Sequence, residues 1–194
     1  AWGSVAAFDI LYISQLRARA MVAPTNGVDR YRFGGSPGGL VMPTKAGLYR
    51  HVFVFDFKSL YPSIIRTFNI DPLSYLQARL RCDPGAGAGD GGLWRTAESA
   101  PEYATEPGVT GDFIRAPNGA LFAREPGILP QLLEGFFAER AAARAAGDAL
   151  AAYTYKIVMN SFYGVLATDS CRFAEGALAG AITVLFVPRS RVRL

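Results

Sequence analysis

The residues best suited to chemistry begin with a carboxylate at the end of an apolar run. Residues 49–57 are rich in β-branched and aromatic side chains, which predicts a strand, and Asp56 lies near its end. Because the run is apolar on both faces, we expect a central strand that is covered on both sides. A carboxylate buried there is costly unless a cation neutralises it, and Mg²⁺ binds carboxylate oxygens together with substrate phosphates. The sequence therefore allows a metal site at Asp56, although a carboxylate that only caps the following turn fits equally well.

The turn after Asp56 offers backbone groups that suit a phosphate. Proline is well tolerated in the first turn of a helix, so Pro62 predicts a helix that starts near it and ends at residues 69–72. The first N–H groups of a helix have no intrahelical partner and attract anions. A phosphate close to Asp56 would therefore find hydrogen-bond donors in this turn.

A second group of polar side chains lies on a helix expected at about residues 149–165. Lys156, Asn160 and Tyr163 share one face of that helix. Another face carries apolar side chains that can pack on a core: Val158, Phe162 and Val165. The polar face places a cation, an amide and an aromatic ring along one groove. The alternative is a solvated helix face whose polar residues are unrelated.

A preceding helix is expected to position that face. Residues 130–150 show a helical pattern in which Arg140 and Arg144 are neighbours one turn apart. The apolar stripe of this helix consists of Leu132, Leu133, Phe136 and Phe137. A break near residues 147–148 separates the two helices, so we expect an antiparallel helical hairpin.

The remaining elements are less regular. Residues 5–22 have a rough helical spacing, and residues 23–47 are rich in Gly and Pro, which predicts loops. Residues 82–119 predict a flexible insert with one β-hairpin turn at 116–119. The glycine-rich run 85–92 is not a phosphate-binding loop, because no Lys-Ser/Thr follows it.

Composition bounds the class of protein. The chain has 194 residues, 51% of them hydrophobic and 19% charged, which is typical of a packed globular protein. The net charge of +4 lies in residues 140–194, which carry 7 basic and 3 acidic side chains. This charge fits an anionic partner such as nucleic acid or a nucleoside triphosphate, and an ordinary solvated surface fits it equally well. The two cysteines have no metal-type spacing, and we find neither a membrane-length apolar stretch nor a signal pattern. We therefore expect a cytoplasmic location without membrane contact.

Two longer motifs resemble those of family B DNA polymerases. Residues 56–65, Asp-Phe-Lys-Ser-Leu-Tyr-Pro-Ser-Ile-Ile, resemble the first palm motif of that family. Residues 155–164, Tyr-Lys-Ile-Val-Met-Asn-Ser-Phe-Tyr-Gly, resemble its fingers motif, and the two occur in the family's order. The resemblance implies a fragment of a DNA-directed DNA polymerase that adds deoxynucleotides to a primer 3′ end by two-metal phosphoryl transfer. It further implies Mg²⁺, deoxynucleoside triphosphates, a DNA primer-template, a role in replication or repair, and a sliding clamp bound through regions outside this chain.

The resemblance also assigns roles to single residues. Asp56 matches the catalytic carboxylate, and Asp56 with the carbonyl of Phe57 matches the metal ligands. The family's nucleotide-binding positions are matched by Phe57, Ser59, Leu60, Tyr61, Arg140, Lys156 and Asn160. Among these, Tyr61 resembles the ring that excludes a ribose 2′-OH. The family's DNA-contacting positions are matched by Gly38, Gly39, Tyr163 and Gly164, although Ser36 stands where the family usually has Tyr.

The fold implied is α+β, a partial polymerase palm sheet with an antiparallel two-helix fingers subdomain. Residues 1–30 would form the end of an exonuclease-like region and a linker. Residues 31–127 would form the N-terminal palm segment, with a flexible insert at about 82–119. Residues 128–166 would form the fingers helices, and residues 167–194 would return to the palm and end in a divergent tail.

The sequence departs from the family pattern at its end. Family members carry a second metal-binding aspartate in an Asp-Thr-Asp-Ser hairpin, and this chain has no such string. Residues 184–194 do not resemble the family and would suit a truncated or frameshifted reading frame. Because one carboxylate cannot hold two Mg²⁺ ions about 3.5–4 Å apart, we expect the chain alone to be inactive. The alternatives are a non-catalytic nucleotide- or DNA-binding remnant, the product of a broken gene, or a fragment of a protein-primed member of the same family.

Overall fold

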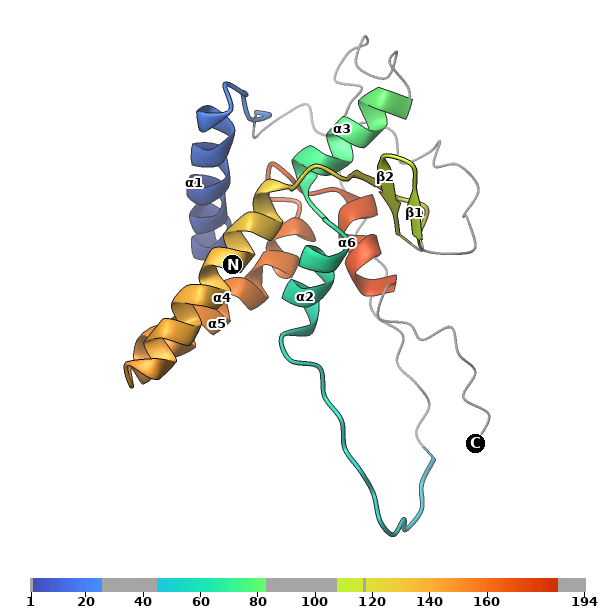
Figure 1. The fold of residues 1–194 in the computed structure, drawn as a ribbon, viewed down its shortest axis with the longest axis vertical. Helices are drawn as coiled ribbons and strands as arrows, with labels where there is room; N and C mark the ends of the chain where they lie inside the picture. Colours follow the sequence, from blue (N-terminus) through green and yellow to red (C-terminus); the bar gives the residue numbers. More distant parts are fainter. Residues whose placement is uncertain (1, 26–44, 83–107, 117, 185–194) are drawn as a thin grey trace.

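The computed structural model describes residues 2–25, 45–82, 108–116 and 118–184, and in these it has helices and one small sheet. The elements are α1 (Trp2–Ala18), α2 (Leu60–Thr67), α3 (Pro72–Cys82), β1 (Gly108–Thr110), β2 (Phe113–Arg115), β3 (Leu121–Ala123), α4 (Ile128–Ala145), α5 (Ala149–Leu166) and α6 (Gly176–Val184). This mixture confirms the α+β class (Figure 1).

The predicted helical hairpin is confirmed. Helices α4 and α5 pack along each other and extend away from the other elements (Figure 1). The reversal between them uses Gly147, whose φ of +74° lies in the left-handed region that glycine adopts without strain. Asp148 then caps α5, because its side chain accepts a hydrogen bond from the Ala151 N–H at 2.9 Å. Both ends of this turn are therefore determined by neighbouring residues.

The sheet is antiparallel, in the order β1-β2-β3. The register places Phe113 opposite Ala123 and Ile114 opposite Phe122. The turn predicted at residues 116–119 joins β2 to β3, with the Ala116 N–H donating to the Ala120 carbonyl at 2.8 Å. Strand β1 lies within the range predicted as a flexible insert, and β2 leads directly into the predicted hairpin turn. Residues 83–107 of that predicted insert lie outside the described residues.

The core forms where α1 crosses α5. One face of α1 is buried, and its members lie at helical spacing: Val5, Phe8, Tyr12 and Leu16. The ring of Phe8 meets the ring of Phe162 edge-on at a centroid distance of 5.4 Å. Phe162 and Val165 are buried and Val158 is half-buried, which confirms the apolar face predicted for α5. The core therefore fixes which side of α5 is left for polar chemistry.

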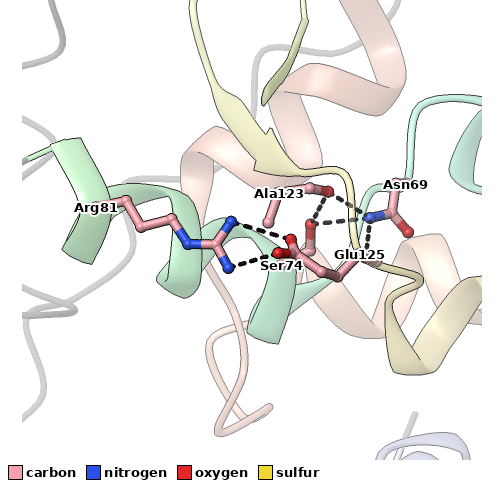
Figure 2. Close-up of polar contacts among 5 residues, drawn as sticks. All are labelled: Asn69, Ser74, Arg81, Ala123 and Glu125. Carbon is pink, nitrogen blue, oxygen red and sulfur yellow. Dashed lines mark hydrogen bonds and ion pairs between the residues drawn. The ribbon is translucent and has the colours of Figure 1, made fainter. Parts of the chain in front are cut away.

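A polar junction connects α3 to β3 (Figure 2). The Asn69 amide donates to the carbonyls of Ala123 at 2.6 Å and Glu125 at 2.7 Å, and the Ser74 hydroxyl also donates to Ala123. At the edge of this junction, Arg81 of α3 forms an ion pair with Glu125 at 2.6 Å. Asn69 has a φ of +51°, a conformation that asparagine tolerates better than most residues. Helix α2 therefore ends at Thr67, just before the predicted residues 69–72, and the chain restarts as α3 at Pro72.

The predicted central strand at residues 49–57 is wrong for this structure. These residues form neither helix nor strand, and the chain runs through them as an extended loop away from the helices (Figure 1). Their apolar side chains are exposed, with Phe53 at 82% and Phe55 at 91%. A strand needs a neighbouring strand to pair its backbone groups, and no strand among the described residues pairs with this segment. The apolar pattern is thus present without the ladder and the covering layer that it predicts.

No helix among the described residues is long and apolar enough to cross a bilayer.

Candidate functional site

A pocket of about 410 Å³ lies between α4 and α5, near the turn that joins them. Its lining consists of Arg140, Arg144, Gly147, Ala149, Ala152, Tyr153 and Lys156. The antiparallel pairing brings Arg140 on α4 to the same pocket as Lys156 on α5, as their predicted roles require. Arg144 also lines the pocket. The sequence shows Arg144 only as a helical neighbour of Arg140, and the spacing of one turn was the available signal.

The pocket is cationic. It contains three basic side chains and no carboxylate. The Nε of Arg140 is buried and has no hydrogen-bond acceptor among the described protein atoms. A buried donor without an acceptor costs about 1–3 kcal/mol. An anion in the pocket would balance the positive charge of the three basic side chains.

Two tyrosines meet at the other end of the same face of α5. Tyr61 on α2 stacks on Tyr163, with ring centroids 4.6 Å apart and ring planes 30° apart. Both rings are half-buried, and Asn160 is exposed on the turn between Lys156 and Tyr163. Tyr163 lies seven positions after Lys156, which corresponds to about 10 Å along the helix. The structure thus lines up a cation, an amide and an aromatic pair, in the order that the sequence predicts.

The start of α2 exposes backbone donors beside Tyr61. Ser59 is the N-cap, with a φ of +53°, and makes no side-chain capping bond. The Ser63 hydroxyl donates to the Lys58 carbonyl at 3.2 Å and stabilises the turn. The N–H groups of Leu60 and Tyr61 belong to the first helical turn, where no intrahelical acceptor exists. A non-glycine residue in the left-handed region costs about 1–3 kcal/mol, a strain often found at ligand sites.

The predicted metal ligands are placed differently from expectation. Asp56 is exposed and is not at the end of a buried strand, so burial gives no reason for a cation there. The oxygen ligands available here are the Asp56 carboxylate and the carbonyl of Phe57. They could take two positions on a Mg²⁺ ion that also binds phosphate oxygens. In the part of the chain that the structure describes, no group of three or more His, Cys, Asp or Glu could hold a metal.

Two predicted DNA contacts cannot be located, and a third is exposed. Gly38 and Gly39 lie outside the described residues. Gly164 is exposed on α5, next to the stacked Tyr163. A Cβ at Gly164 would meet no atom within 4 Å, so an open surface lies beside the tyrosine pair.

A buried carboxylate that the sequence did not single out lies in the link between α2 and α3. Asp71 accepts hydrogen bonds at Oδ1 from the Tyr12 hydroxyl (2.9 Å) and the Leu129 N–H (2.8 Å), and at Oδ2 from the Ser74 N–H (3.0 Å). Burial raises the pKa of Asp71 despite these bonds. Burial and the nearby carboxylate also raise the pKa of Tyr12 well above its ordinary value. An Asp followed by Pro72 is a typical helix start, and that signal could have identified it.

Comparisons with known proteins agree with the motifs. The sequence profile of DNA polymerase family B matches residues 6–185. DNA polymerase II of Escherichia coli (strain K12) is 38% identical over 182 residues, which cover 94% of this chain and 20% of that protein. The DNA polymerase of Orf virus (strain NZ2) is 32% identical over 76% of this chain and 16% of its own length. The DNA polymerase of Thermococcus sp. (strain 9oN-7) is 29% identical over 78% of this chain and 17% of its own length.

The chain spans a fifth or less of the length of these relatives, the largest share being 20%. The matched region nevertheless includes the pocket, the tyrosine pair and both motifs. Because the family profile matches nearly the whole chain, this protein belongs to the family B DNA polymerases.

Proposed function

We propose that this chain carries the nucleotide-binding part of a DNA-directed DNA polymerase, which adds deoxynucleotides to a primer 3′ end on a DNA template. One observation carries the proposal: a three-cation pocket and a stacked tyrosine pair lie about 10 Å apart along one face of α5. The α4–α5 hairpin then corresponds to the fingers, and α2 with the turn before it belongs to the palm.

The pocket is proposed to hold the triphosphate. Arg140, Arg144 and Lys156 contribute three positive charges, and the buried Nε of Arg140 needs an acceptor. Phosphoryl transfer depends on positioning and on neutralising charge on the phosphate oxygens, and side-chain cations do both. The N–H groups of Ser59 and Leu60 add neutral donors at the start of α2.

The tyrosine pair is proposed to select the sugar and contact the nascent base pair. Tyr61 presents a ring from α2, and Tyr163 holds it by stacking from α5. A ring fixed in this way leaves no space for a ribose 2′-OH, whereas a deoxyribose fits against it. Asn160 faces the nucleotide from the turn between the two ends, and Gly38, Gly39 and Gly164 contact DNA.

Asp56 and the carbonyl of Phe57 are proposed to hold Mg²⁺ together with the phosphates. The metal would neutralise charge on the attacking 3′-oxygen and the leaving pyrophosphate. Asp56 is one carboxylate, and the two-metal reaction requires more, so the 194-residue chain by itself is not expected to polymerise. Template-directed primer extension by this chain, lost in Asp56→Ala, would overturn that expectation.

Binding of a Mg²⁺–deoxynucleoside triphosphate to the chain tests the proposal directly. Isothermal titration calorimetry should show that Arg140→Ala and Lys156→Ala each weaken binding by about tenfold or more, since each removes a charge-assisted contact. Arg17→Ala is the control, because Arg17 is an exposed cation at the end of α1, away from the pocket. Equal affinities in wild type and all three variants would refute the proposed site.

A non-catalytic nucleotide- or DNA-binding remnant is the second candidate. The exposure of Asp56 favours it, because a catalytic carboxylate has to be held in place. Binding of the triphosphate without primer extension in the complete parent protein would support the remnant. Extension by the parent protein would exclude it.

A further inference from the structure

The N-cap residue of helix α4 provides no side-chain hydrogen bond to the first turn of the helix. Its N-cap is Gly127, which has no side chain to accept a hydrogen bond. Two side chains from much earlier in the chain accept from its first N–H groups instead. Asn69 Oδ1 accepts from the Gly127 N–H, and Asp71 Oδ1 accepts from the Leu129 N–H, both at 2.8 Å. Both residues lie in the link between α2 and α3, so the start of α4 is held by the end of α2.

Asp71 joins three helices at this point. Besides capping α4, it accepts from the Ser74 N–H in the first turn of α3 and from the Tyr12 hydroxyl of α1. The same hydroxyl accepts from the Leu73 N–H at 3.0 Å. The fit is tight, because a Cβ added at Gly127 would lie 2.6 Å from the Cβ of Asp71. The carboxylate is therefore tied to all three helices and cannot shift without breaking a contact.

The orientation of α4 matters because its basic side chains lie far along the helix from this junction. Arg140 lies eleven residues beyond Leu129, or about 16 Å along the helix. Because α5 packs along α4, a tilt of about 5° at the start of α4 would carry the whole hairpin and move its guanidinium by about 1 Å relative to α2, enough to impair a site that depends on geometry. We infer that Asp71 is a positioning residue, which sets the distance between the cation pocket and Tyr61 and thereby the fit of a whole nucleotide.

A carboxylate is suited to this role and an amide is not. Asp71 accepts three hydrogen bonds and donates none. In Asp71→Asn the side chain keeps its shape but presents an NH₂ group to at least one donor. That change loosens the junction while leaving the apolar core and every side chain of the pocket in place.

The inference rests on the proposed function, and two probes separate the two. Inorganic tripolyphosphate can occupy the pocket alone, which α4 and α5 build between themselves. A nucleotide such as dATP has to reach both the pocket and Tyr61 on α2. Loosening the junction should therefore weaken the nucleotide and spare tripolyphosphate.

The experiment measures both affinities by calorimetry on the 194-residue chain with Mg²⁺. For Asp71→Asn we expect dATP to bind about tenfold more weakly and tripolyphosphate to change by less than about twofold. Tyr12→Phe removes one partner of Asp71 but keeps the ring, so it should act in the same direction by about threefold and covers the case in which Asp71→Asn does not fold. Leu178→Ala is the control, because it opens the buried core at α6 outside this network and should leave both affinities unchanged.

The outcomes are distinct. Unchanged dATP affinity in the folded variants would overturn the positioning role and leave the proposed site intact. Parallel losses for both probes would also overturn it, since the effect would then be general loosening. Failure of the wild type to bind either probe would refute the proposed function, and the positioning role with it.

Discussion

The α4–α5 hairpin and residues 48–57 are both rich in large apolar side chains, but they differ in what surrounds those side chains. In the hairpin, Leu133, Met159 and Phe162 are buried. In the extended segment, Val54 is 88% and Phe55 is 91% exposed. A helix satisfies its own backbone and needs a neighbour for one face, whereas a strand needs a partner for its backbone and a cover for each face. The described residues therefore pack around the hairpin, whereas they do not enclose the segment around Asp56.

The largest expected effect comes from truncating one ring in each region. Phe162→Ala should lower the free energy of unfolding by about 3–5 kcal/mol, because a buried aromatic ring leaves a cavity. Phe55→Ala removes the same group from an exposed position and should change it by less than about 0.5 kcal/mol. Urea denaturation followed by circular dichroism measures both. Equal losses would mean that residues 48–57 are packed in solution, and the comparison would fail.

A smaller effect is expected where the hairpin joins the other helices. Gly127→Ala would place a Cβ 2.6 Å from the Cβ of Asp71 and should destabilise the protein by about 1–3 kcal/mol. Gly135→Ala lies on the same helix in open space and should stabilise it by about 0.5–1 kcal/mol. Opposite signs in thermal melts would show that the hairpin tolerates change along its length but not at its attachment. If Gly127→Ala left the stability unchanged, the close contact between Gly127 and Asp71 would be contradicted.

The pH dependence of the free energy of unfolding should differ between the wild type and Asp71→Asn. Because burial raises the pKa of Asp71 above its ordinary value, the folded state binds this proton more tightly than the unfolded state. The contribution of Asp71 to the free energy of unfolding is therefore fully present below about pH 4. It is lost as the pH rises through the pKa that Asp71 has in the folded state. The side chain of Asp71→Asn cannot titrate. The free energy of unfolding of the wild type, relative to that of the variant, should therefore fall as the pH rises from about 4 through this pKa. Urea midpoints measured from acidic to neutral pH test this, and a relative rise would reverse the sign.

The smallest effect is expected at the exposed ion pair of Arg81 and Glu125. The hydrogen bond from Arg81 lowers the pKa of Glu125, but both side chains are solvated and salt screens the pair. Arg81→Ala should shift the urea midpoint less than any variant above, and the shift should disappear at high salt. If the loss of stability persisted in high salt, the apolar stem of Arg81 would instead stabilise the junction in Figure 2 by packing.

Elements governed by neighbouring residues could be predicted from the sequence. The break at Gly147 and Asp148, the β-turn at residues 116–119 and the apolar face of α5 all follow from interactions within a few residues. The strand predicted at 49–57 failed because the same apolar pattern requires a partner that local sequence does not supply. Strand β1 was missed because a three-residue strand carries little periodicity.

For the site, the sequence by itself determined the residue types, their order and the face of α5 on which Lys156, Asn160 and Tyr163 lie, because helical spacing is a local property. Tertiary structure alone decided that Arg144 joins the pocket, that Tyr61 stacks on Tyr163, and that Asp71 caps a helix beginning more than fifty residues later. Those contacts join segments far apart in the chain, and their geometry depends on how the helices pack, which periodicity and spacing do not encode.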